Sequence, residues 1–287
     1  MKRWKKFLVL LVGISFLIFI VAFSILWIQK DQIIQGFVAD YNQQIEGEIK
    51  IEETIISPFT NFPYISIDVK GLQLLENKTT QEALVYMEDV YVGFDLWELL
   101  QGDFHIKSLL LNNGQVSIIQ DYKGRYNIVE AFNELQENQK VSDSSMDYFL
   151  KKIELQNILF TKESLQDSLV ISTQIKTAKS SIQSIENTLK VALDLEAIVN
   201  VSQGENVYFV KEKYTELHTN FSYDLRHPKM LFEASELVVS NVVFRMQGEI
   251  DVMNDVDFDL KFAGLKENFD LLIGLAPPEV EEALRVY

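Results

Sequence analysis

An uninterrupted apolar run near the start of the chain constrains everything that follows it. The run extends from Phe7 to Ile28 and contains no charged residue. As a helix that rises about 1.5 Å per residue, its roughly 22 residues would reach about 33 Å, enough to cross a hydrocarbon core about 30 Å thick. Only a helix satisfies every backbone polar group of a single segment in lipid. The sequence therefore predicts a transmembrane helix at 7–28, anchored by Phe7 and Ile28 and by Trp4 and Trp27 at the depth of the lipid headgroups.

The segments beside this run predict that it is retained and how it is oriented. A cleaved signal peptide has a shorter apolar region of roughly 7–15 residues, followed by small residues at a cleavage site. Here the run is longer, and residues 26–30 (LWIQK) contain no such site. Residues 1–6 form a basic tail, which the positive-inside rule keeps in the cytoplasm. We therefore expect a single-pass anchor, with the bulk of the chain on the other side of the membrane.

Composition excludes several classes of function for the exported part. The 287 residues include 42 Asp and Glu against 26 Lys and Arg, which gives a net charge of −16. Such an acidic surface repels nucleic acid, so we expect no nucleic-acid partner. The chain has no cysteine, which excludes disulfides and zinc–thiolate sites. With 47% hydrophobic and 24% charged residues, a packed globular part is expected.

The period of the apolar residues changes from helical to alternating at about residue 49. Before that point, apolar residues recur at spacings of three and four and predict a short amphipathic helix at about 30–45. After it, apolar and polar residues alternate, which is typical of strands with one buried face. Asn112-Asn113-Gly114 lies between two such segments and predicts a β-hairpin. The chain is thus expected to be mainly β, a succession of antiparallel strands with a few short helices.

Composition along the chain divides the exported part into four segments. A first β-region, with its leading helix, occupies 29–136, and a polar linker follows at 137–147. A second antiparallel β-region occupies 148–265, and a C-terminal helical segment is expected at 266–287. The abrupt end of that segment favours a chain that is the N-terminal part of a longer protein.

No pattern in the sequence predicts catalysis or metal binding. The chain lacks a phosphate loop, a dinucleotide fingerprint, a serine-nucleophile elbow and an HExxH pair. Its strand carboxylates alternate with apolar residues, so they are expected on a solvated face and not in a convergent acid–base pair. His218 has the same polar setting and is expected at the surface. We therefore expect no enzymatic activity, no cofactor and no metal. The carboxylates are Asp194, Glu196, Asp251, Asp257 and Asp259.

The alternating strands produce an apolar face that must be covered. The expected helices are too few to cover a sheet of this length, and a large exposed apolar surface is an aggregation liability. The sheet can pack on itself as a closed β-sandwich with a dry core, which is the usual arrangement for such strands. Alternatively, it can curl into a gutter whose inner face holds an apolar ligand. Alternation alone favours the sandwich.

The order of short motifs in the first half of the chain resembles the AsmA family. The likeness begins with the anchor and the amphipathic helix, and extends over about residues 1–128. From residue 148 onward it is a likeness of pattern only. The motifs are ISPFTNFPYISI at 56–67, VYVGFDLWELLQG at 90–102, IKSL at 106–109, NGQV at 113–116 and GRYNI at 124–128.

This resemblance implies a protein of the Gram-negative envelope, anchored in the bacterial inner membrane with its N-terminus in the cytoplasm and its bulk in the periplasm. Members of the family are similar to bridge-type lipid-transfer proteins, whose taco-shaped β-sheet holds an apolar groove for acyl chains. The resemblance therefore implies a long antiparallel curled sheet, a β-groove, in place of the closed β-sandwich. The family implies no catalytic residue. Its bridging members are much longer, so this chain either belongs to a longer protein or acts locally at the inner membrane.

The expected function is to handle or transfer phospholipid through an apolar β-groove, with acyl chains, the inner membrane and other envelope proteins as partners. Each methylene removed from water contributes about 0.8 kcal/mol, so such a groove can hold lipid without a polar site. The alternative is a non-enzymatic periplasmic scaffold that assists outer-membrane protein or envelope assembly, with a dry sandwich core. The expected groove residues are Ile65, Ile67, Val69, Val90, Val92, Phe94, Val191, Leu193, Leu195, Phe221, Phe244, Phe258 and Leu260.

Overall fold

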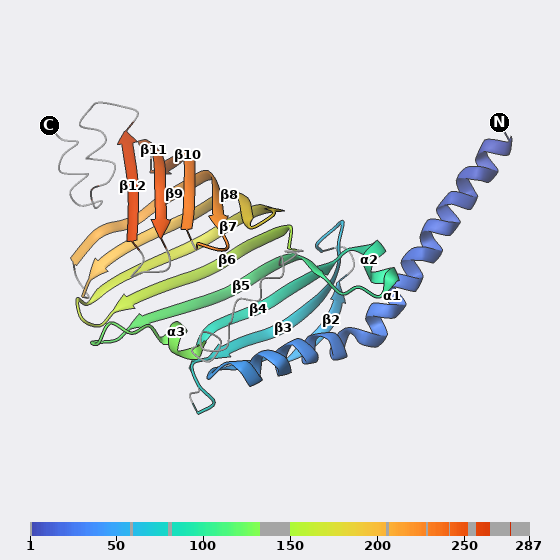
Figure 1. The fold of residues 1–287 in the computed structure, drawn as a ribbon, viewed down its shortest axis with the longest axis horizontal. Helices are drawn as coiled ribbons and strands as arrows, with labels where there is room; N and C mark the ends of the chain where they lie inside the picture. The colour runs from blue at the N-terminus through green and yellow to red at the C-terminus, as the bar shows by residue number, and fades with distance from the viewer. Residues whose placement is uncertain are drawn as a thin grey trace.

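One long helix and one large curled sheet make up the structure, a computed structural model (Figure 1). It describes residues 2–57, 60–79, 82–132, 150–204, 207–227, 229–240, 242–251, 257–264 and 276. The prediction of a mainly β chain with few helices is confirmed. The helices are α1 (Lys2–Gln44), α2 (Leu96–Gln101) and α3 (Asn127–Ala131). The strands are β1 (Glu48–Lys50), β2 (Glu53–Ser57), β3 (Ile65–Leu75), β4 (Ala83–Phe94), β5 (Ile106–Gln120), β6 (Lys152–Ser164), β7 (Leu169–Ile185), β8 (Thr188–Gln203), β9 (Val207–Asp224), β10 (Lys229–Val239), β11 (Val242–Asp251) and β12 (Asp257–Gly264).

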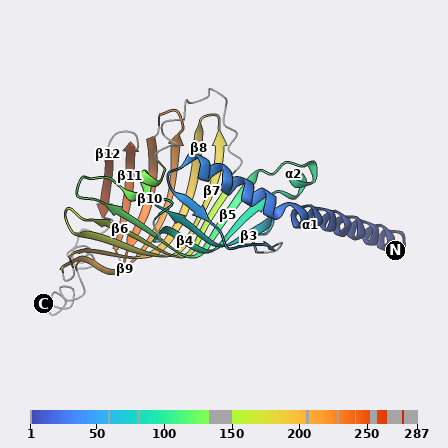
Figure 2. The same ribbon diagram turned by 90° about the horizontal axis from the view of Figure 1, so that it is seen from below.

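Helix α1 joins two segments that the sequence predicts as separate helices. The predicted span at 7–28 and the predicted amphipathic helix at 30–45 form one helix of 43 residues. Its C-terminal part lies along the first strands, and its N-terminal part projects away from the sheet (Figures 1 and 2). Within the described part of the chain, no helix is both long enough and apolar enough to cross a membrane.

The C-terminal part of α1 is fixed to the sheet by apolar and polar contacts. Ile34 of α1 is 5% exposed, and Ile45, which follows the last residue of the helix, is 2% exposed. The side chain of Asn42 exchanges two hydrogen bonds with the backbone of Ile49 in β1, at 2.9 and 2.7 Å. These contacts satisfy backbone groups at the end of the sheet and set the direction in which the helix leaves it.

The twelve strands form a single sheet in which almost every strand pairs with the next one along the chain. β1 and β2 both pair with β3 at one end of the strand order, and β12 lies at the other end. All pairs are antiparallel except β5 with β6, which are parallel. The prediction of a wholly antiparallel sheet is wrong at this pair, where the regions predicted at 29–136 and 148–265 meet. Parallel neighbours require a crossover connection, which here joins the end of β5 to the start of β6.

A row of bulges crosses the sheet and shifts the alternation of consecutive strands by one residue. In β5, Leu111 and Gly114 lie on the same face with two residues between them, and Asn113 takes up the extra residue with φ 52°. The same step separates Leu155 from Ile158, their partners in β6. β3, β4 and β7 make matching steps in register. Bulges bend strands and increase their twist, so an aligned row of them curls the sheet.

Asn113-Gly114 forms one of these bulges and not the predicted hairpin, because β5 continues through it from Ile106 to Gln120. Both uses require left-handed backbone, which Asn adopts more readily than most residues, so the dipeptide alone does not distinguish them. The Asn113 side chain accepts a hydrogen bond from Asn157 Nδ2 at 2.7 Å and donates one to Glu88 Oε2 at 2.9 Å. These bonds join three neighbouring strands along the bulge row.

A closed hydrophobic core occupies one end of the sheet, where α1 and α2 cover the strands. It joins Ile34 of α1 and Leu99 of α2 to strand residues such as Ile67 and Phe94, each 5% exposed or less. Helix α2 is set in place by Asp95, whose side chain accepts hydrogen bonds from the backbone at its first turn.

The sheet curls without closing (Figures 1 and 2). β12 does not pair with β1 or β2, and all described strands belong to the same sheet. A closed β-sandwich, which alternation alone favours, is therefore wrong for the described residues, whereas the long curled sheet is confirmed. The physical reason lies in the bulge row, which supplies curvature that a regular alternation does not reveal. The linker predicted at 137–147 and the helical segment predicted at 266–287, apart from residue 276, lie outside the described residues.

Gly114 tests the importance of the bulge row. A Cβ at this position would lie 2.3 Å from Met87 Sδ and 2.5 Å from the backbone oxygen of Tyr86. We therefore expect Gly114→Ala to lower the free energy of unfolding by about 2 kcal/mol through overpacking. Gly36→Ala is the matched control, because no heavy atom lies within 4 Å of its added Cβ. Urea unfolding of the full chain, followed by circular dichroism, measures both; equal stabilities would contradict the packing argument.

Candidate functional site

Cross-strand register assembles the apolar residues of successive strands into continuous rows. One row crosses the sheet from β3 to β11, and each member lies opposite the next. We call the inward side of the sheet, which carries this row, the apolar face. The outward side is the acidic face. The row consists of Val69, Val90, Leu111, Leu155, Ala178, Leu195, Leu217, Leu237 and Phe244.

The residues predicted to line a groove all occupy register positions on this apolar face. In the first strands, Ile65 pairs with Phe94, Ile67 with Val92 and Val69 with Val90. In the later strands, Val191 pairs with Phe221, and Leu193 and Leu195 follow on the same side of β8. Phe244 lies in β11, while Phe258 and Leu260 pair with Ile250 and Gly248. Sequence alternation therefore placed these positions on a common face.

The structure divides these residues into two environments that the sequence does not separate. Ile65, Ile67, Val69, Val90, Val92 and Phe94 belong to the closed core and are 0–7% exposed. The other environment comprises β7 to β11, where most of the larger apolar side chains at inward positions are half-buried and no described helix covers them. Ala178, Ala197, Val242 and Met246 are buried there. We call this second part the open groove. Val191, Leu193, Leu195, Phe221 and Phe244 lie in it.

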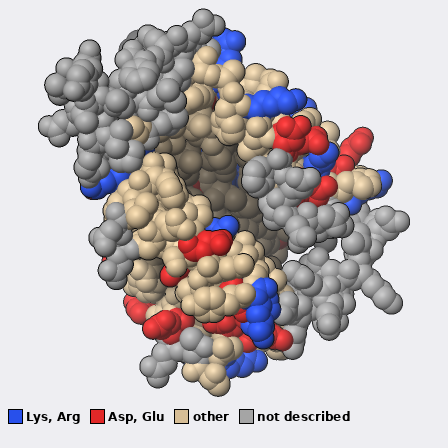
Figure 3. All heavy atoms as spheres, turned by 90° about the vertical axis from the view of Figure 1, so that its left-hand side faces the viewer, with Lys and Arg blue, Asp and Glu red and all other residues tan. Residues whose placement is uncertain are grey.

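The open groove is visible as a hollow in the surface of the molecule. Figure 3 views the structure end-on and shows a central depression whose walls are mostly uncharged residues. Within it, the rings of Phe221 and Phe232 lie side by side, with centroids 5.2 Å apart. The acidic face turns outward, so that Lys190, Asp194 and Glu196 of β8 are exposed. The curl of the sheet thus separates an apolar interior from a charged exterior.

Two lysines are exceptions to the uncharged character of the apolar face. Lys162 of β6 pairs with Ile118 and Ile171, and Lys213 of β9 pairs with Val199, all at inward register positions. Sequence reasoning missed both. Their spacing could have revealed them, because residues two apart in a strand lie on the same face of the sheet. Lys162, for example, lies two residues after the inward residue Phe160.

A buried polar cluster lies on the acidic face of β3 and β4. The Lys70 ammonium contacts Asp68 Oδ2 at 2.8 Å and also bonds to Asp89. Burial raises the pKa of Asp68, an effect that Lys70 opposes, while the two carboxylates raise the pKa of Lys70. Asp68 Oδ1 and the Ser66 hydroxyl are buried without a hydrogen-bond partner. The cluster joins two strands by a fixed ion-pair network and presents no nucleophile.

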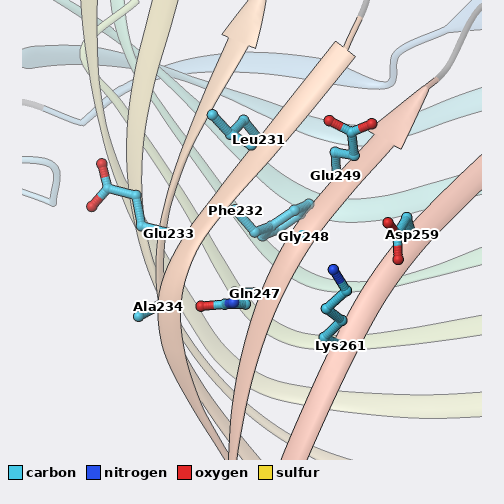
Figure 4. A pocket seen from close by; sticks show the side chains of 9 residues that line it. All are labelled: Leu231, Phe232, Glu233, Ala234, Gln247, Gly248, Glu249, Asp259 and Lys261. Carbon is cyan, nitrogen blue, oxygen red and sulfur yellow. The ribbon is translucent and has the colours of Figure 1, made fainter.

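Two smaller depressions offer no evident chemistry. One of about 380 Å³ lies over β10 to β12, where Glu249 stands opposite Asp259, with Glu233, Lys261 and Leu231 nearby (Figure 4). Another of about 440 Å³ follows the amide side chains of the bulge row. Among the described residues, no group of three or more His, Asp or Glu side chains could hold a metal ion.

In comparisons with known proteins, no protein family, characterised protein or solved structure matched this chain. The geometry of the apolar face is therefore the basis for interpreting the site.

Three substitutions to aspartate distinguish a closed core from an open groove. Ile67→Asp buries an unpaired charge in the core, so we expect a loss of about 4 kcal/mol or more in the free energy of unfolding. Val191→Asp in the half-buried groove should cost about 1 kcal/mol or less, because water reaches the carboxylate. Ala192→Asp, its neighbour on the exposed face, is the control. Urea unfolding measures all three; a Val191→Asp loss as large as that of Ile67→Asp would mean that the groove is dry.

His218 reports the electrostatics of the acidic face. Its Nδ1 lies 2.7 Å from Asp194 Oδ1, and this hydrogen bond, together with the charges of Asp194, Glu216 and Glu236, raises the pKa of the imidazole. Protonated His218 therefore adds stability below the ordinary pKa of histidine, and this contribution is lost as the pH rises through the raised value. We expect Asp194→Asn to lower the His218 pKa and Asp259→Asn to leave it unchanged. NMR titration of the histidine-labelled chain measures the shift; an unchanged pKa in Asp194→Asn would contradict the pairing.

Proposed function

We propose that this protein handles or transfers phospholipid, whose acyl chains occupy the open groove of the curled sheet. The observation that carries the proposal is the continuous apolar row from Val69 to Phe244, which is covered at one end and only half-buried from Leu195 in β8 to Phe244 in β11. A dry core would bury these side chains completely. An acyl chain would remove them from water, at about 25 cal/mol for each Å² of apolar surface covered.

The shape of the groove also favours an extended apolar ligand over a compact one. Its lining comes from neighbouring strands in register, so the apolar surface continues from strand to strand over β7 to β11. An acyl chain is flexible and apolar throughout its length, so it needs a continuous apolar surface and not a shaped pocket. The charged acidic face, which carries residues such as Asp194 and Glu196, keeps the exterior in water.

Membrane anchorage through α1 is part of the proposal. Phe7, Trp27 and Ile28 are 61%, 62% and 79% exposed, and Trp4 lies in the first turns of the same helix. Exposed apolar side chains on a helix that projects from the sheet support its insertion in lipid. With the basic tail in the cytoplasm, the sheet would lie in the periplasm beside the inner membrane. This arrangement agrees with the AsmA-like order of motifs in residues 1–128.

A non-enzymatic scaffold in envelope assembly is the second candidate, and one observation favours it. β12 is the last strand of the sheet order and carries Phe262, which is 54% exposed. Such an edge can add a strand from another protein. In that case the apolar face would meet a protein segment in place of lipid. Neither candidate assigns a catalytic residue.

Site-specific photocrosslinking in living cells tests the proposed function with the full chain. A benzophenone amino acid replaces Val191 in the open groove or, as the matched control, Ala192 on the exposed face. We expect mass spectrometry to find phospholipid adducts at position 191 at roughly ten times the yield at position 192, because the two side chains face opposite sides of the sheet.

Equal lipid yields at the two positions would overturn the groove, since they would indicate unspecific contact with the membrane. Protein adducts without lipid at position 191 would favour the scaffold instead. The same probe at Ile67, in the closed core, should give neither adduct if the protein remains folded.

A further inference from the structure

The end of the sheet at which α1 leaves carries two exposed aromatic side chains. Phe62, in the turn between β2 and β3, is 76% exposed, and Trp97, in α2, is 60% exposed. Single apolar residues are common at protein surfaces and need no explanation. Two large rings at the same end of a molecule are a different case, because they can present one apolar surface to a partner.

Strand register places both rings at the same end of the sheet. Ile65, the first residue of β3, pairs with Phe94, the last residue of β4. Phe62 precedes Ile65 by three residues, and Trp97 follows Phe94 by three residues. The two segments therefore leave the sheet from neighbouring strand ends. Figure 1 shows α2 beside the point at which α1 departs from the sheet, and the two helices pack on each other.

Both segments are fixed to the sheet, so the exposed rings have defined positions. Next to Phe62, Asn61 is 3% exposed, and its side chain donates a hydrogen bond to Ser108 Oγ of β5 at 3.0 Å. Two residues after Trp97, Leu99 is completely buried in the closed core. The exposure of the two rings is thus imposed by the fold of the segments that carry them.

Contacts between α1 and the first strands set the level of this end along the helix. The Asn42 side chain bonds to β1, which pairs with the last residues of β3. Closer to the N-terminus of the helix, Lys30 Nζ donates to the backbone oxygen of Thr54 at 2.7 Å, in β2, which pairs with the first part of β3. Followed toward its N-terminus, α1 therefore runs toward the start of β3.

This direction brings the end of the sheet beside the apolar run of α1. β2 continues for three residues beyond Thr54, from Ile55 to Ser57. Three strand residues span about 10 Å, which a helix covers in about seven residues. Counted from Lys30, the end of the sheet is thus level with the last residues of the predicted span at 7–28, where Trp27 is 62% exposed.

The carboxylates on either side of Trp97 have partners within the protein. Glu98 lies 2.6 Å from Lys107 Nζ and 3.2 Å from His105 Nδ1. Asp95 accepts hydrogen bonds from the backbone at the first turn of α2. These contacts reduce the repulsion that an acidic protein would experience at an anionic lipid surface. Asp103, which follows α2, is exposed and can remain in water beside such a contact.

We propose that Phe62 and Trp97 lie in the headgroup region of the membrane that α1 enters, so that the α2 end of the sheet contacts the lipid surface directly. Aromatic side chains prefer this depth, where their rings leave water and the indole N–H keeps hydrogen-bond acceptors. The inference rests on the membrane anchorage in the proposed function and adds a second contact to it. A single helix leaves the sheet free to tilt, whereas a contact beside the helix fixes the orientation of the sheet on the membrane.

The absence of cysteine from the chain allows a direct test, because one introduced cysteine carries the only label. Phe62→Cys and Trp97→Cys are each labelled with a nitrobenzoxadiazole fluorophore, and the full chain is reconstituted in vesicles of phosphatidylethanolamine and phosphatidylglycerol. Quenching is measured with phospholipid that carries a nitroxide at the headgroup end of its acyl chain. We expect quenching at positions 62 and 97 to be at least about threefold stronger than at a label in water.

Two further labelled variants are the controls. Tyr122→Cys represents the label in water, because Tyr122 is 75% exposed, as Phe62 is, but lies after β5, at the other end of that strand from α2. Ile28→Cys reports on α1 itself, where Ile28 is 79% exposed. All four positions are exposed, so their substitution leaves the closed core intact.

The outcomes separate this inference from the function on which it rests. Equal quenching at positions 62, 97 and 122, together with strong quenching at 28, would overturn the contact and leave the anchorage in place. Weak quenching at 28 would remove the anchorage and the contact together. Labels at 62 and 97 that are shielded from water without being quenched by lipid would indicate a protein partner and would also overturn the proposal. Phospholipid in the groove is measured independently, by the adducts at position 191.

Discussion

The structure depends on keeping one face of the sheet in register while the sheet bends. Every apolar row must continue from strand to strand, because a slip of one residue would turn the apolar side chains outward. The bulge row meets this requirement by shifting neighbouring strands together, as Asn113 and Asn157 show by their matching left-handed conformations and direct hydrogen bond. Curvature is thereby introduced without loss of the apolar face, and a hollow interior becomes possible.

The same residue types serve two purposes on this face, and the difference lies in what covers them. Ile67 and Val191 both alternate with polar neighbours, yet Ile67 is sealed beneath α1 and α2 while Val191 borders the open hollow. The closed end gives the sheet its stability. The open groove can therefore leave apolar surface half-exposed without the whole fold depending on a ligand.

Much of this arrangement could be predicted from the sequence, and the failures have identifiable causes. Period-two alternation gave the strands and the common face of the candidate groove residues. It could not distinguish a bulge from a turn at Asn113, since both need the same backbone conformation, and it placed a hairpin within β5. It also missed Lys213, because a single left-handed residue at Glu212 changes which lysine of that segment faces inward. The local alternation of residues indicates which side chains share a face of the sheet. Whether that face becomes a closed core or an open groove depends on the helices that cover it and on single left-handed residues.

The parallel contact between β5 and β6 has a consequence for how such a sheet is extended. The closed core lies mainly on β3 to β5 and reaches Ile158 of β6, whereas each strand from β7 to β11 pairs with the strand before it and the strand after it. Two added strands widen the sheet by about 10 Å. Duplication or deletion of hairpins beyond this junction would lengthen or shorten the open groove while leaving the closed core unchanged. The length of the open groove would then depend on the number of hairpins, while the closed core stays the same.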